Sequence, residues 1–146
     1  MQHWEQQPHI MTDGIADWDW AQDIRSAGPR QQCLIATRNI PLIGFVQIID
    51  PALEPEHYGS EVPANQRAID IFIGEARYLN QGLGTTIMQQ AIAPCFDNPA
   101  VTGIPVDLMA SNTRAHRFYA RLDFQFLTAQ TFGTDDCHAY FLARAD

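Results

Sequence analysis

The sequence predicts an α+β fold, a mixed sheet with helices packed on it. Two observations support this prediction. Short helices are followed by strand, strand, long loop, strand, helix, strand, helix, strand and strand, an order typical of a layered sheet-and-helix domain. The chain has 146 residues, of which 46% are hydrophobic, enough for one core but not two. We therefore expect a single domain over residues 1–146.

The first half of the chain predicts helices and then a hairpin. Residues 15–25 are the best helical candidate, ending near Gly28-Pro29. Strand-like segments at 32–37 and 41–49 are separated by a turn at Arg38-Asn39, which indicates a hairpin. Residues 50–66, with three prolines, read as a loop of a length that is usually functional or mobile.

The second half alternates strands and helices. Residues 68–74 are apolar on both faces, as in the centre of a sheet, and only Asp70 interrupts them. Apolar residues at helical spacing predict a helix over 82–95, and a second helix is expected over 113–122. Further strands are predicted at 101–108, 124–131 and 137–144, the last two joined by a turn at 133–136.

Composition narrows the class of partner. The formal net charge of −8 disfavours nucleic acid and anionic membranes and favours a cationic small molecule. Without an 18-residue apolar run or an apolar signal core, we expect a cytoplasmic protein that does not enter a membrane. Cys33, Cys95 and Cys137 form no CxxC pair, and the histidines lack ligand spacing, so neither a disulfide framework nor a metal site is expected.

A glycine-containing turn between the strand at 68–74 and the following helix could bind phosphate. In Gln81-Gly82-Leu83-Gly84-Thr85, glycine lets an anion approach the free N–H groups at the helix start. The alternative is an ordinary tight turn, since the third glycine of a dinucleotide fingerprint and the Gly-Lys-Ser/Thr ending of a P-loop are absent.

A second motif follows about 27 residues later. It reads Ser-Asn-Thr-Arg-Ala-His-Arg-Phe-Tyr over 111–119, followed by Leu122-Asp123-Phe124. Together the two motifs resemble the GCN5-related N-acetyltransferase (GNAT) superfamily, from about residue 32 to the end. Asp123 stands where the family has glycine, and Asp tolerates a left-handed backbone. The resemblance implies a mostly antiparallel sheet splayed between the strands at 68–74 and 101–108, with the pantetheine of acetyl-CoA between them. Set against the family's pattern, we expect its first strand and first helix to be absent or shortened here.

A closer resemblance is to aminoglycoside 6′-N-acetyltransferases and their siderophore-acylating relatives. The matching segments are 4–11, Ile69-Asp70, 79–85, 96–99, and Asp107 with 111–115. The resemblance implies acetyl-CoA-dependent transfer to a cationic amine, the 6′-amine of an aminoglycoside. Alternative acceptors are a siderophore hydroxylamine, a polyamine or a protein amine. A CoA-binding module without catalysis is another alternative.

The resemblance also implies roles for individual residues. Asp70 is expected to hold the substrate ammonium and accept its proton; otherwise it is satisfied structurally by backbone groups or by Arg67. Tyr119 is expected to protonate the CoA thiolate, the alternative being a core tyrosine. The expected cofactor contacts are the backbone of a bulged strand at Phe72 and Ile73, the loop residues Gln81, Gly82, Leu83, Gly84 and Thr85, and Asn112.

Acidic and aromatic residues are expected to line the acceptor site. Carboxylates bind ammonium groups, and aromatic rings offer stacking faces, as a polyamine-like sugar requires. The candidates are Trp18, Trp20, Tyr58, Asp107 and Asp136, with Glu54, Glu56 and Glu61 in the long loop. In the alternative, the tryptophans are core anchors and the acids a solvated rim. A sheet edge left open by the short N-terminal region would favour a homodimer.

Overall fold

A computed structural model describes residues 4, 7–11, 31–37, 40–53, 63 and 65–145 of the chain. The elements are α1 (Pro8–Met11), β1 (Gln31–Thr37), β2 (Ile40–Ile49), η1 (Pro51–Leu53), β3 (Ala68–Ile73), η2 (Ala76–Tyr78), α4 (Leu83–Asp97), β4 (Gly103–Met109), α5 (Thr113–Ala120), β5 (Gln125–Phe132) and β6 (Asp135–Ala143). Every strand and both long helices predicted in the second half are confirmed, as is the hairpin strand pair. The predicted helix at 15–25 and most of the long loop lie outside the described residues.

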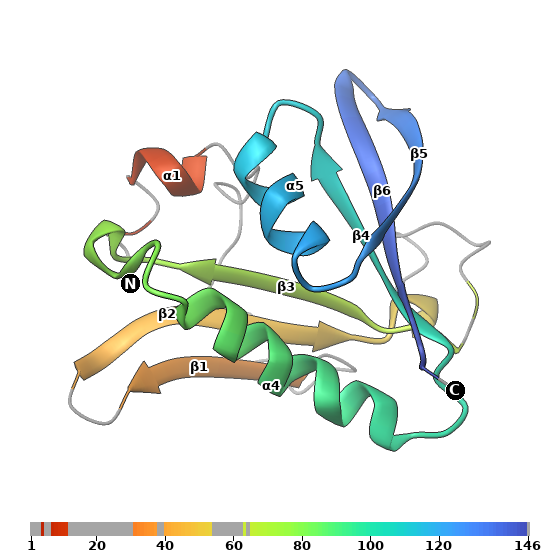
Figure 1. Cartoon of the computed structure of the whole chain (residues 1–146), viewed down its shortest axis with the longest axis horizontal. Coiled ribbons are helices and arrows are strands. Elements are labelled where there is room, and N and C mark those ends of the chain that lie inside the picture. The colour runs from red at the N-terminus through yellow and green to blue at the C-terminus, as the bar shows by residue number, and fades with distance from the viewer. Residues whose placement is uncertain are drawn as a thin grey trace.

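The strands form two antiparallel three-stranded sheets that part from each other (Figure 1). One has the order β1-β2-β3 and the other β4-β6-β5. β3 and β4 meet at their base through a parallel bridge between Gln66 and Gly103. There the Arg67 amide donates to the Gly103 carbonyl over 3.2 Å, and the Thr102 amide to the Asn65 carbonyl over 2.8 Å. Beyond this bridge the two strands diverge, which confirms the predicted splay.

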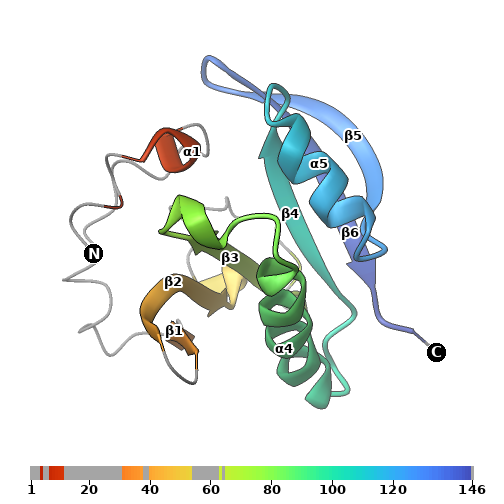
Figure 2. The ribbon, with the colours of Figure 1, turned by 60° about the vertical axis from the view of Figure 1, so that its left-hand side comes forward.

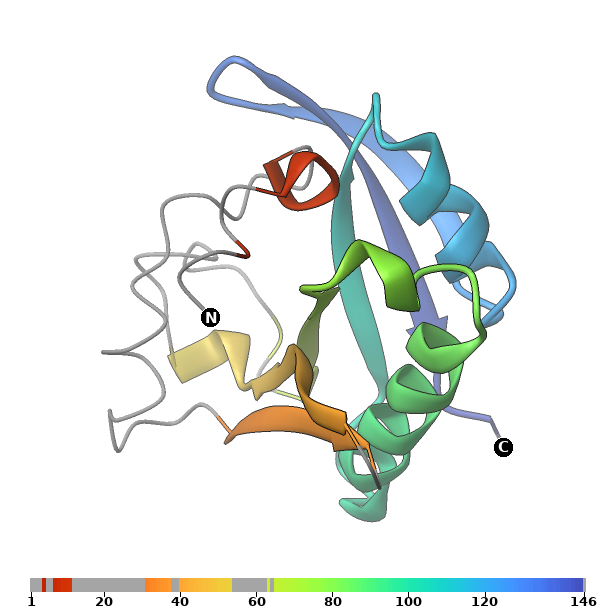
Figure 3. The same ribbon diagram turned by 90° about the vertical axis from the view of Figure 1, so that its left-hand side faces the viewer.

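The two long helices cover one side of the sheets and share one core with them. α4 and α5 lie on one side and α1 on the other (Figure 2, Figure 3). The core joins Ile69 of β3, Met88 of α4, Ile104 of β4 and Tyr119 of α5. Because side chains alternate along a strand, Asp70 and Asp107 point to the side away from α4 and α5.

Asp123 follows α5 with a backbone φ of 65°. This left-handed conformation suits glycine, the residue that the related motif carries there, and Asp adopts it more readily than most residues. The expectation for this position is therefore confirmed. The chain then turns into β5 with Phe124 buried in the core.

Arg144 closes the C-terminal end of α4. Its guanidinium donates to the Phe96 carbonyl at 2.7 and 2.9 Å, to the Asn98 carbonyl at 2.8 Å and to the Val101 carbonyl at 3.1 Å. These carbonyls lie at the negative end of the helix dipole or just beyond it, where a cation is favourable.

Arg144→Ala is expected to lower the free energy of unfolding by about 2–3 kcal/mol, since several charge-assisted hydrogen bonds are lost. Chemical denaturation would measure the change. The exposed Arg121, substituted in the same way, should change stability by less than about 0.5 kcal/mol. Equal losses in the two variants would contradict this role for Arg144.

Candidate active site

The glycine loop takes a left-handed path into α4. Asn80 has a φ of 60° and Gly82, the N-cap residue, a φ of 78°. No described side chain caps this helix start, and a Cβ on Gly82 would meet nothing within 4 Å. The N–H groups at the start of an α-helix have no intrahelical partner. The loop thus fits a phosphate group, which would bind to the first-turn amides without basic side chains.

Gly84 places this helix start beside the splay. A Cβ at Gly84 would lie 3.3 Å from the Phe118 ring of α5 and 3.8 Å from Cδ1 of Ile73. The first turn of α4 therefore packs closely against α5 and the end of β3. Gln81 donates a hydrogen bond from its side-chain amide to the Arg77 carbonyl of η2.

The backbone of β3 offers hydrogen-bonding groups to the splay at alternate residues. The Gly74 amide donates to the Ile43 carbonyl of β2 over 2.8 Å. Bonded and non-bonded pairs alternate along an antiparallel ladder, so Phe72 also directs its main-chain groups to β2. Those of Ile71 and Ile73 point the other way, towards β4. The hydrogen bond from the Arg67 N–H to the Gly103 carbonyl fits the same alternation, because Arg67 is an even number of residues from Ile71 and Ile73.

The predicted bulge at Phe72 and Ile73 is wrong. The β2–β3 ladder runs without a register shift from Ala68 to Ile73. Without a bulge, only Ile73 of that pair presents main-chain groups at the open edge, because the ladder with β2 uses those of Phe72. Ile71 is the second edge residue, and the strand pattern alone did not identify it.

The N-terminal segment anchors on the end of β3. His9 donates Nε2–H to the Ile73 carbonyl over 2.9 Å, and Trp4 donates its indole N–H to Glu75 over 3.1 Å. The Trp4 ring meets Phe72 edge-on at 5.8 Å and covers Gly74, where a Cβ would fall 2.0 Å from the ring. Sequence reasoning missed His9, which carries no motif of its own.

Asp70 faces the side of β3 that α1 covers, and Gln47 is bonded to it. Gln47 lies directly opposite on β2 and donates Nε2–H to Oδ2 of Asp70 over 2.8 Å. The suggested structural partner, Arg67, instead forms an ion pair with Asp50 at 3.0 Å. The cross-strand amide of Gln47 was not predicted.

Tyr119 lies in α5 and Asn112 at its start, as expected, and each makes a structural contact. The Tyr119 ring is buried and lies edge-on to Phe118 at 5.2 Å and to Phe124 at 5.1 Å. Asn112 is the N-cap, and its Oδ1 accepts from the Ala115 amide over 3.0 Å. Tyr119 therefore belongs to the core and Asn112 caps α5, and their roles toward the cofactor stay predictions.

Asp107 and Asp136 do not share one face of their sheet. Asp107 accepts a hydrogen bond from Nε2 of Gln130 over 2.8 Å, and Asp136 accepts one from Oγ1 of Thr131 over 3.0 Å. Strand alternation places Asp136 on the face opposite to Asp107. Desolvation raises the pKa of the Asp107 carboxyl above its ordinary value, and the Gln130 hydrogen bond offsets part of this rise. Trp18, Trp20, Tyr58 and the loop glutamates lie outside the described residues.

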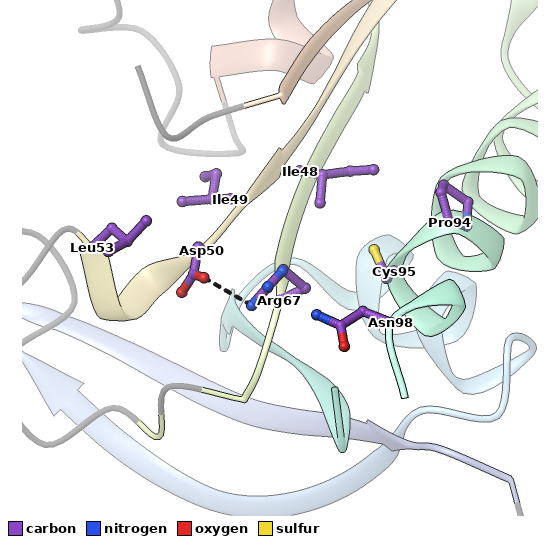
Figure 4. Close-up of a pocket in the computed structure, with 8 residues that line it drawn as sticks. All are labelled: Ile48, Ile49, Asp50, Leu53, Arg67, Pro94, Cys95 and Asn98. Carbon is purple, nitrogen blue, oxygen red and sulfur yellow. Dashed lines mark ion pairs between the residues drawn. The ribbon is translucent and has the colours of Figure 1, made fainter. Parts of the chain in front are cut away.

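A separate pocket of about 300 Å³ lies at the opposite end of α4 from the glycine loop (Figure 4). Its lining includes Cys95 and Asn98 together with the Arg67–Asp50 pair. Burial raises the pKa of the Cys95 thiol to about 11, against the opposing effect of Arg67, so the thiol is protonated at neutral pH. This pocket is distinct from the candidate active site.

Comparisons with known proteins identify the family. A family model described as an acetyltransferase (GNAT) domain matches residues 1–132. The chain belongs to the GNAT acetyltransferase family. Among the described residues of this acetyltransferase, we find no cluster of three or more His, Cys, Asp or Glu suited to a metal ion. Nor does that part of the chain contain a helix long and apolar enough to cross a membrane.

Relatives of this acetyltransferase include enzymes named for aminoglycosides. It is 35% identical over 65 residues to the aminoglycoside N(6′)-acetyltransferase type 1 of Klebsiella pneumoniae, covering 44% of this chain and 32% of that relative. The same identity holds over 65 residues with the kanamycin resistance protein of Rhizobium radiobacter, of which 60% is covered. The matched stretch is thus about a third of the first relative's length.

Solved structures share the fold of this acetyltransferase. The aminoglycoside acetyltransferase AAC(6′)-Ib in complex with coenzyme A and kanamycin superimposes with a TM-score of 0.79 at 22% identity, covering 97% of this chain and 86% of that one. The spermidine N-acetyltransferase SpeG F149A mutant from Vibrio cholerae superimposes with a TM-score of 0.63 at 14% identity, covering 85% and 70%.

Proposed function

We propose that this GNAT acetyltransferase transfers the acetyl group of acetyl-CoA directly to the 6′-amine of an aminoglycoside. The observation that carries the proposal is the splay between β3 and β4, with the start of α4, which no described side chain caps, on one side and Asp70 on the other. The curated relatives support the aminoglycoside class of acceptor. In a cell, such an activity would confer resistance to the drug that it modifies.

In this proposal the loop and the open strand edge bind the cofactor. The first-turn amides of Leu83, Gly84 and Thr85 hold the pyrophosphate, and the main chain of Ile71 and Ile73 meets the pantetheine and the thioester. The Ile73 carbonyl already accepts from His9, so its N–H is the group that remains for the cofactor. Asn112 extends the cofactor surface from the start of α5.

Asp70 and Tyr119 complete the transfer in this proposal. Asp70 holds the substrate ammonium and takes its proton, which leaves a neutral amine that attacks the thioester carbonyl. The Tyr119 hydroxyl gives a proton to the departing CoA thiolate and regains one as the acetylated amine loses its own. Acetyl-CoA supplies the activated acetyl group, and Asp70 releases the proton of the ammonium to solvent before the next turnover.

The identity of the acceptor distinguishes this proposal from the alternative functions. Thiol release from acetyl-CoA would be followed with kanamycin, ribostamycin, spermidine and a hydroxylamine as acceptors. Release with the aminoglycosides supports the proposal. Release with spermidine alone would mean that the protein transfers acetyl groups to a polyamine and not to an aminoglycoside. The net charge of −8 also suits such a cationic acceptor. Silence with every acceptor, while CoA still binds, indicates a module without catalysis.

Asp107 gives this proposal a pH dependence. A protonated Asp107 no longer attracts an ammonium, and its raised pKa means that this loss begins at a higher pH than for an ordinary aspartate. Gln130→Leu removes the hydrogen bond that partly offsets this rise in pKa. The variant's KM for kanamycin should therefore begin to rise at a still higher pH, and at mildly acidic pH it should exceed the wild-type KM several-fold. Gln125→Leu, an exposed change on the same strand, should follow the wild-type course. An identical pH course of KM in Gln130→Leu would rule out Asp107 as an ammonium ligand.

A further inference from the structure

Gln47 is a fully buried polar side chain on a strand whose other buried residues are apolar. It lies in β2 between Val46 and Ile48, and its exposed fraction is 0%. On the same face of β2, Phe45 and Ile49 are also buried. A glutamine at such a position loses its hydration, so its amide needs partners within the protein.

Among the described residues, the nitrogen of this amide has a hydrogen-bond partner and its oxygen does not. Nε2 donates to Oδ2 of Asp70 over 2.8 Å, across a hydrogen-bonded pair of the β2–β3 ladder. Oε1 is buried and has no hydrogen-bond partner among the described residues. Methionine or leucine would fill a similar volume without burying an unpaired oxygen. Packing alone therefore does not account for the glutamine.

A base that gains a proton changes the hydrogen bonds it needs. As a carboxylate, Asp70 accepts at Oδ2; once it has taken the proton of the substrate ammonium, Oδ2–H must donate. The amide of Gln47 carries a donor and an acceptor on one carbon, so a half-turn about its last side-chain bond exchanges them. Before the half-turn, Nε2–H donates to the ionised Asp70. After it, Oε1 accepts the hydrogen bond from the protonated Asp70.

We propose that Gln47 is a positioning residue that orients Asp70 and satisfies it in both of its protonation states. This inference rests on the proposed function, in which Asp70 accepts the ammonium proton. The balance is simple: one N–H bond of the substrate ammonium breaks and one O–H bond forms on Asp70. Gln47 loses and gains no proton, because it only reverses its amide.

Gln47→Leu tests this role. We expect kcat with kanamycin to fall by about tenfold or more, because the carboxylate loses the hydrogen bond by which Gln47 orients it. KM for acetyl-CoA should stay unchanged. The acidic limb of the kcat/KM profile should move to higher pH by about one unit, since the ionised carboxylate has lost a donor. The melting temperature should be unchanged or higher, and Gln47→Met should behave alike if leucine disturbs the fold.

Two comparisons separate this role from a structural one. Ile49→Val, a buried change on the same face of β2, should alter stability but leave the pH limb in place. In an Asp70→Asn background, Gln47→Leu should lower kcat by less than about twofold, because the group that it positions is gone. A folded Gln47→Leu enzyme with wild-type kcat and pH profile overturns the role of Gln47 and leaves Asp70 in place. Full activity of Asp70→Asn overturns the proposed base itself.

Discussion

Asp70→Asn is expected to lower kcat/KM for acetyl transfer to kanamycin by about 10²–10⁴-fold. An amide cannot take a proton from the ammonium or attract its charge, whereas it fills the same space as the carboxylate. Gln47 can still meet the new side chain, so the fold should persist. Steady-state thiol release at saturating acetyl-CoA, with CoA affinity measured by calorimetry, would separate the chemical loss from a binding loss.

Asp97→Asn is the matched control for that experiment. Asp97 is exposed at the last turn of α4, the end away from the glycine loop. The same chemical change there should leave kcat/KM within about twofold of the wild type, as is usual for a surface substitution. An Asp70→Asn enzyme as active as Asp97→Asn would show that another group accepts the proton.

Gly82→Asp is expected to raise the dissociation constant for CoA by about tenfold or more. Gly82 is exposed and has room for a side chain, so the main effects are a negative charge at the helix start proposed to bind the pyrophosphate and left-handed backbone strain. Calorimetric titration with CoA would measure the loss.

Gly133→Asp supplies the matched control for backbone strain. Gly133 has a φ of 61°, and a Cβ there would also meet nothing within 4 Å, but it lies in the turn between β5 and β6. This variant should keep wild-type affinity for CoA. Equal affinity in both variants would mean that the loop at Gly82 does not bind the pyrophosphate.

Local patterns predicted the elements because each pattern is set by nearby residues. The apolar segment at 68–74 and the periodic residues of α4 need only their own side chains to indicate strand and helix. The splay was predicted only through the resemblance to the GNAT superfamily, which the glycine loop and the segment at 111–119 carry together. The structure brings the two motifs together at Gly84 and Phe118, a contact that the sequence did not predict.

The contacts around Asp70 could not be predicted because they depend on register. β2 and β3 are joined by a long connection rather than a tight turn, and turn geometry fixes register only in short hairpins. The pairing of Gln47 with Asp70 therefore had no local signal. The bulge at Phe72 was wrong for the same reason, and Arg67 bonds to Asp50 instead of Asp70.

The site of acetylation on kanamycin tests the central claim most directly. The enzyme would be incubated with kanamycin and acetyl-CoA, and the product examined by mass spectrometry and two-dimensional NMR. We predict a single added acetyl group on the 6′-amine, formed by the wild-type enzyme and not by Asp70→Asn. An acetyl group on another amine, or no acetylated kanamycin while CoA binds normally, would contradict the account.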